Sequence, residues 1–141
     1  MRVAELQGAL LDYWIARADG FVDGSTREAA DALDGLGAPR VFKTVNGDLR
    51  VAKKDQIRPW QPSADWAQAG PIIERERIEI VPWNEPPHIT EDWRARTFSS
   101  IADGMHSSRE WKGSTALVAA MRAYVASKFG EEVPDEAAET V

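Results

Sequence analysis

Three carboxylates in the middle of the chain, Asp65, Glu74 and Glu76, are the residues best suited to catalysis. Clustered carboxylates hold the divalent cations of two-metal sites, so these three predict a metal-dependent nuclease as one alternative. A familiar nuclease pattern, however, places Asp and then Glu-x-Lys on adjacent strands. Here the two glutamates alternate with Arg75 and Arg77 in a helical pattern, and arginine stays protonated, so it cannot act as a general base. Such alternating charge is more typical of a salt-bridged helix face in solvent.

Other catalytic residue sets are missing from the sequence. His88 and His106 stand alone, with no further His or Cys at the spacing of a zinc site, and the chain has no cysteine. It also has no glycine-rich phosphate loop and no Gly-x-Ser-x-Gly motif. We therefore predict no catalytic residue, no metal and no cofactor, and a protein that acts by binding rather than by catalysis.

The six tryptophans are the most unusual feature of the composition. Large rings fill protein cores, but tryptophan and arginine also anchor interfaces. Trp66 lies at the start of a predicted helix, and the simpler interpretation is that it fills the core. Trp111 lies between charged neighbours and favours neither interpretation. The residues that we predict to form a binding surface are Trp66, Gln68, Gly70, Glu74, Trp93, Trp111 and Arg122.

The Gly70-Pro71 step has two interpretations. Glycine lets a ligand or another backbone approach closely, and proline is favoured at the first turn of a helix, whose free N–H groups bind anions. The simpler interpretation is a break or kink in one helix, which leaves no site.

Composition limits the partners and the location. The net charge is −6, with 23 acidic against 17 basic residues, so we do not expect nucleic-acid binding, which needs a basic field. No apolar run approaches the ~20 residues of a membrane span. Without cysteine or a signal-like start, the sequence predicts a cytoplasmic protein. We expect one domain over residues 1–134 and an acidic, flexible tail over residues 135–141.

Three helices are predicted from apolar residues at helical spacing. The first spans residues 5–18 and ends before Gly20. The second begins at Ala64 with Ser63 as its cap, and Gly70-Pro71 interrupts it before residue 77. The third follows Ser114 or Thr115, runs to residue 129 and ends at Gly130.

Strands are predicted between these helices. Residues 41–45 and 48–52 should form a hairpin around Asn46-Gly47 in a type I′ turn. Further strands are expected at 78–83 and 93–98, with loops at 58–63, 84–87 and 99–113. Residues 26–36 fit a short helix or a loop. The fold class is therefore α+β: a small sheet of mostly antiparallel strands and hairpins, packed by an N-terminal, a central and a C-terminal helix.

Three segments together resemble a known family: ELQGALLDYWIARADG at 5–20, SADWAQAGPIIERE at 63–76 and LVAAMRAYVASKFG at 117–130. In this order they are similar to the NinX-like family, small proteins encoded in the recombination region of lambda-like phages and in bacterial prophages. The chain departs from the usual pattern at Ala69, where a second glycine is usual, and at Ser114-Thr115, where the pattern has Thr-Pro.

The resemblance implies a setting and no biochemical activity. It predicts a phage or prophage protein of unknown function in a bacterial cytoplasm. Its expected partner is an unknown host or phage protein, with a homodimer as one arrangement. The alternative in this setting is a nuclease or another accessory protein of DNA recombination that uses Asp65, Glu74 and Glu76.

Overall fold

The computed structural model describes residues 1–24, 39–54, 56–85, 88–101, 104–107 and 109–134. The short helix or loop expected at 26–36 and the tail expected at 135–141 lie outside these residues. The helices are η1 (Val3–Glu5, a 3-10 turn), α1 (Gly8–Ala18), α3 (Trp66–Glu76) and α4 (Ala116–Phe129). The strands are β1 (Val22–Asp23), β2 (Arg40–Lys43), β3 (Leu49–Lys53), β4 (Gln56–Pro59), β5 (Glu79–Glu85), β6 (His88–Arg96), β7 (Phe98–Ile101), β8 (Gly104–Ser107) and β9 (Trp111–Gly113).

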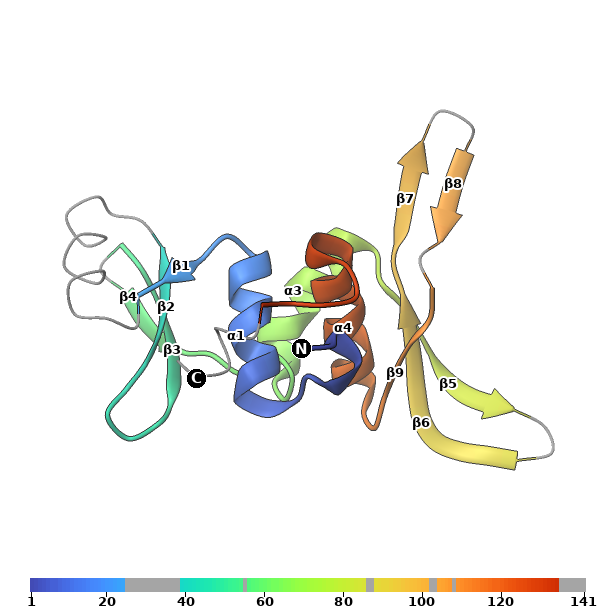
Figure 1. Cartoon of the computed structure of the whole chain (residues 1–141), viewed down its shortest axis with the longest axis horizontal. Helices are drawn as coiled ribbons and strands as arrows, with labels where there is room; N and C mark the ends of the chain where they lie inside the picture. Colours follow the sequence, from blue (N-terminus) through green and yellow to red (C-terminus); the bar gives the residue numbers. More distant parts are fainter. Residues whose placement is uncertain (25–38, 55, 86–87, 102–103, 108, 135–141) are drawn as a thin grey trace.

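The helices separate two small sheets, which confirms the α+β class (Figure 1). One sheet has the order β1-β2-β3-β4 and lies beside α1; the other has the order β5-β6-β9 and lies beside α4. Strands β7 and β8 form a two-stranded ribbon that extends away from the helices. Among the described pairings only β1 with β2 is parallel.

Helix α1 is buried on nearly every side. Its residues 11–16 are all buried, because α1 lies between the four-stranded sheet and α4. The predicted start at Glu5 is wrong: residues 3–5 form the 3-10 turn, Gln7 is extended, and Gly8 begins α1 with a φ of +56°. The glycine permits this left-handed conformation at low cost.

The predicted hairpin is confirmed as β2 and β3, but its turn differs. The Thr44 N–H donates to the Asp48 carbonyl at 2.8 Å, and the Gly47 N–H donates to the Thr44 carbonyl at 2.9 Å. Gly47 has a φ of +90° whereas Asn46 does not have a positive φ, so the loop has three residues rather than a two-residue type I′ turn. The expected loop at 58–63 begins inside the edge strand β4, where Pro59 is tolerated because no neighbour needs its N–H.

Helix α3 is one element that runs through Pro71. Its cap is Asp65, whose carboxylate accepts from the Ala67 N–H at 2.9 Å, and not Ser63 as predicted. Ser63 instead donates its N–H to the Asp12 carboxylate at 2.8 Å and so faces α1. The helix continues because Gly70 has no Cβ to clash with the proline ring. It ends at Arg77, whose φ of 53° is left-handed.

The second sheet and the ribbon contain more strands than the sequence predicts. β5 extends through the expected linker to Glu85, with an irregularity between Pro82 and Asn84, and β6 begins at His88. The loop expected at 99–113 is wrong, because β8 and β9 lie within it. Its Ser- and Gly-rich sequence lacks the apolar alternation that marks a half-buried strand, yet backbone pairing holds the strands without it.

Helix α4 is confirmed with the predicted ends. The Thr115 hydroxyl accepts from the Val118 N–H at 3.1 Å, and Gly130 ends the helix with a φ of +86°. The helix buries Leu117 and Met121 against its neighbours as predicted, and three alanines as well. No helix in the described part of the chain is long and apolar enough to cross a membrane.

Candidate functional site

The solvent-facing side of α3 carries three of the predicted binding residues. Trp66, Gly70 and Glu74 follow one another at intervals of four residues and therefore share one face. Trp66 is 58% exposed, so the simpler expectation that it fills the core is wrong. Ala67 and Pro71 on the adjoining row are exposed as well. We call these five residues the α3 face.

The local sequence explains why α3 presents this face. Ala69 and Ile72 are its buried residues, and Ile73 packs partly against the core. These positions leave the opposite rows to solvent. Apart from its chain neighbours and the backbone of α3, a Cβ added to Gly70 would meet no atom within 4 Å, so Gly70 lies open on that side. The hypothesis of a new helix start at Pro71, with free N–H groups for an anion, is wrong because α3 begins five residues earlier.

Gln68 holds the segment that leads into α3. Its Oε1 accepts from the Gln61 N–H at 2.7 Å, and its Nε2 donates to the Pro59 carbonyl at 2.7 Å. Both bonds fix the chain between β4 and α3. Gln68 was predicted as a binding residue, but these bonds give it a structural role: it fixes the segment that precedes the α3 face.

The three carboxylates of the nuclease alternative do not converge. Asp65 caps one end of α3 and Glu76 lies at the other end of its 11 residues, a span of about 16 Å. Glu74 is exposed. Within the described residues no group of three His, Cys, Asp or Glu side chains could hold a metal ion. These three residues therefore do not form the metal cluster that the alternative requires.

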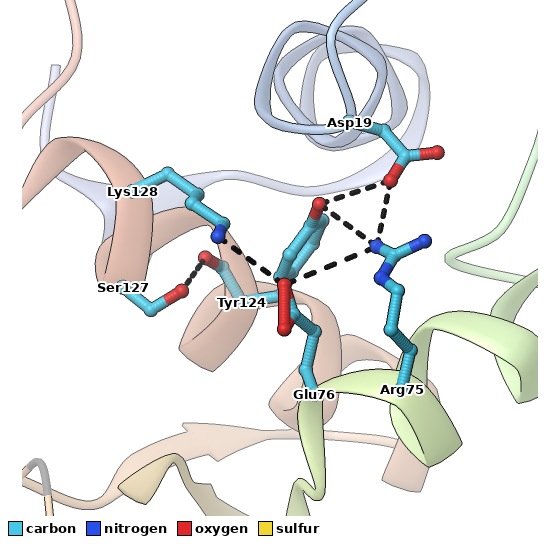
Figure 2. Close-up of polar contacts among 6 residues, drawn as sticks. All are labelled: Asp19, Arg75, Glu76, Tyr124, Ser127 and Lys128. Atoms are coloured by element: carbon cyan, nitrogen blue, oxygen red, sulfur yellow. Dashed lines mark hydrogen bonds and ion pairs between the residues drawn. The ribbon is translucent and has the colours of Figure 1, made fainter. Parts of the chain in front are cut away.

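Glu76 belongs instead to a polar cluster between the three helices (Figure 2). The Arg75 Nη2 donates to Asp19 at 2.7 Å and to the Tyr124 hydroxyl at 3.1 Å, and that hydroxyl donates to Asp19 at 3.0 Å. Glu76 lies 3.2 Å from the Lys128 ammonium. Burial, together with the nearby Asp19 charge, raises the pKa of Tyr124. The cluster joins the ends of α1, α3 and α4, and so orients the α3 face.

The remaining predicted binding residues, Trp93, Trp111 and Arg122, lie on β6, β9 and α4, outside the α3 face. Trp111 is only 3% exposed and belongs to the core, with the Arg109 guanidinium 4.1 Å from its ring centre. Trp93 is half-buried and pairs with Gly113 across β6 and β9. Arg122 donates to the Leu6 carbonyl at 2.9 Å and to the Lys112 carbonyl at 2.8 Å. Trp111 and Arg122 line one hollow.

Sequence reasoning missed one buried acid, Asp12 on α1. It is 4% exposed and faces a hollow of about 480 Å³ that Trp60 also lines. Burial raises the pKa of Asp12 to about 6, although hydrogen bonds from the backbone and side chain of Ser63 act in the opposite direction. The Trp60 indole donates to the Asp12 carbonyl at 2.9 Å. The signal was an aspartate between Leu11 and Tyr13, in the most apolar stretch of α1.

The chain belongs to the family described as bacteriophage P22 NinX, because the model of that family matches residues 2–128. The match confirms the resemblance carried by the three segments. It also extends through residues 21–56, where those segments give no indication. No curated protein matches the chain.

Proposed function

We propose that this NinX-family chain is a non-enzymatic interaction protein that binds a host or phage protein in the bacterial cytoplasm through the α3 face. The observation that carries the proposal is Trp66, a large aromatic residue that is 58% exposed at the start of a firmly held helix. Tryptophan is among the residues that most often dominate interface energetics. Burying the rest of its ring against a partner would contribute on the order of 2 kcal/mol.

The composition of the α3 face fits the centre of a protein interface. Trp66, Ala67, Gly70 and Pro71 carry no charge, and all except Trp66 are small or compact. A partner backbone can therefore approach closely around the indole. Glu74 lies one turn further on and supplies a polar rim. Interfaces commonly combine an uncharged centre with such a rim. The partner should offer an apolar pocket for one indole ring.

The α3 face is also held in place before any partner binds. Asp65 caps the first turn, Gln68 fixes the preceding segment, and Arg75 ties the last turn to Asp19. Binding through a face that is already ordered loses less conformational entropy than binding through a loop. This arrangement supports contact as the role of α3.

Affinity capture with two matched variants tests the proposal. Trp66→Ala removes the exposed indole, and Ile57→Ala removes a side chain of similar exposure, 55%, on β4 in the four-stranded sheet. Both variants should fold normally, since exposed substitutions away from special features rarely change stability by more than about 0.5 kcal/mol. A specific partner from infected or lysogenic cells should be retained by wild type and by Ile57→Ala, and lost with Trp66→Ala.

Two results would contradict the proposal. One is a captured protein that Trp66→Ala retains as well as the wild type does. The other is self-association of the purified chain that Trp66→Ala abolishes, measured by light scattering. In that case the occupant of the α3 face is a second copy rather than a host or phage protein.

A further inference from the structure

A hollow of about 380 Å³ lies where β9 meets the start of α4. Its charged and polar lining comes from Asp92, Arg109, Glu110, Lys112, Ser114 and Arg122. It differs from the α3 face in its elements and in its chemistry, because this lining is largely charged.

Arg122 is the unusual member of this lining. Its guanidinium is half-buried, and the two groups that accept its hydrogen bonds, the carbonyls of Leu6 and Lys112, are both neutral. Within the described part of the chain, no carboxylate lies within ion-pair distance of Arg122. Burial lowers its pKa, and no acid offsets this effect. A guanidinium has five N–H donors, so further donors remain for a ligand.

The other charges of the hollow are compensated. Arg109 lies 2.9 Å from Glu131, Lys112 lies 2.9 Å from Asp92, and Glu110 lies 3.1 Å from Arg94. Among the residues that the structure describes, the lining thus has three cations, Arg109, Lys112 and Arg122, against two carboxylates, Asp92 and Glu110. Three minus two leaves one positive charge, in a protein whose net charge is −6. The carbonyl bonds of Arg122 explain its position but do not balance its charge.

We infer that this hollow binds one carboxylate group. A guanidinium matches the two oxygens of a carboxylate with parallel hydrogen bonds. The excess of one positive charge suits a monoanion, whereas Asp92 and Glu110 at the same hollow would repel a phosphate dianion. Lys112 and the exposed Ser114 hydroxyl supply further donors at the rim. This carboxylate site is separate from the α3 face. A carboxylate could bind here even if no partner binds through Trp66, and a partner could bind through Trp66 even if no carboxylate binds here.

Nuclear magnetic resonance titration of the purified, isotope-labelled full chain tests the inference. The probe is N-acetyl-Gly-Glu-Gly-amide, with the Gln peptide as its neutral match and inorganic phosphate as the other anion. The Glu peptide should give saturable shifts of the Trp111 indole N–H and of the Gly113 and Ser114 amides. The Gln peptide should not, and added salt should weaken the response.

Variants assign the response to the hollow. Arg122→Lys keeps the positive charge but loses the paired N–H donors of the guanidinium, and it should weaken binding of the Glu peptide by about tenfold. Because Arg122 also supports the fold, Lys112→Gln provides a second variant at the exposed rim, which should weaken binding severalfold. Lys128→Gln, which removes an exposed lysine paired with Glu76 elsewhere, should leave binding unchanged.

Three outcomes would overturn the inference. The first is an equal response to the Glu and Gln peptides. The second is tighter binding of phosphate at the same residues, which would make the hollow a phosphate site. The third is an affinity for the Glu peptide that Arg122→Lys and Lys112→Gln both leave unchanged.

Discussion

The Tyr124 hydroxyl donates a hydrogen bond of 3.0 Å to the Asp19 carboxylate and thereby joins α4 to the end of α1. Arg75 of α3 contacts both groups, so three helices from distant parts of the chain meet at one carboxylate (Figure 2). The Tyr124 residue is only 1% exposed, and a hydrogen bond to a charged group is stronger there than on the surface.

Tyr124→Phe tests the strength of this junction. The substitution removes the hydrogen bond that the hydroxyl donates to Asp19 and the one that it accepts from Arg75, and it keeps the buried ring, so the free energy of unfolding should fall by about 1–3 kcal/mol. Urea unfolding measures the change. Ser127→Ala, one turn away on the exposed side of α4, loses only a bond to the Tyr124 carbonyl and should cost less than about 0.5 kcal/mol. Equal stability of Tyr124→Phe and wild type would show that the junction adds nothing.

Asp12 should make the protein more stable in mild acid. Its pKa is about 6 in the folded chain against an ordinary value of 3.8, so the folded state binds the proton more tightly than the unfolded state does. The resulting stabilisation is fully present below pH 3.8 and is lost as the pH rises through about 6. A shift of about two units corresponds to roughly 3 kcal/mol.

Asp12→Asn isolates this effect, since asparagine does not titrate. Between pH 4 and pH 7 the unfolding free energy of the wild type should fall by about 2–2.5 kcal/mol relative to that of Asp12→Asn, because the other groups cancel in the difference and the full effect of roughly 3 kcal/mol is reached only below pH 3.8. Urea unfolding at several pH values gives both curves. Parallel curves would contradict a buried Asp12 carboxylate.

Two glycines should both resist replacement by alanine, for different reasons. A Cβ on Gly113 would lie 2.4 Å from the Ala119 backbone nitrogen, where β9 touches α4, so Gly113→Ala should destabilise by about 1–3 kcal/mol. Gly70→Ala adds a Cβ that meets no atom within 4 Å beyond its chain neighbours and the helix backbone, but this Cβ crowds the ring of Pro71, the next residue. It should therefore destabilise α3 instead of giving the gain of about 0.5–1 kcal/mol that is usual for Gly to Ala inside a helix. Thermal unfolding of both variants decides the matter. A neutral Gly113→Ala would mean that β9 packs less closely on α4.

Helix α4 was predictable because local signals and burial agree. Thr115, the apolar positions after it and Gly130 mark its start, its buried side and its end. The centre of α3 was less clear, since Pro71 usually breaks a helix and only the neighbouring glycine permits it here. Ser63 could have capped α3 with its hydroxyl, but that hydroxyl, like the Ser63 N–H, is hydrogen-bonded to Asp12, 51 residues away in sequence.

The strands were the hardest part to predict. β4 is fully exposed and ends in proline, and its four residues show neither a β-like composition nor an apolar alternation that would mark it as a strand.

The burial of the tryptophans was equally hard to predict from local sequence. The charged neighbours of Trp111 left core and surface equally open, but β9 alternates, so the ring faces inward while Lys112 faces out. The position of Trp66 at a helix start suggested burial, yet only the packing of Ala69 and Ile72 decides which rows of α3 face solvent.

The most direct test of the proposed role is photo-crosslinking in infected or lysogenic bacteria. A photoreactive side chain replaces Ala67 on the α3 face in one strain and Gln56 on β4 in another; both positions are exposed. A partner at the α3 face predicts a discrete crosslinked protein from position 67, lost when Trp66→Ala is added, and no such product from position 56. The same products from both positions, or none from position 67, would contradict the claim that this chain acts through Trp66.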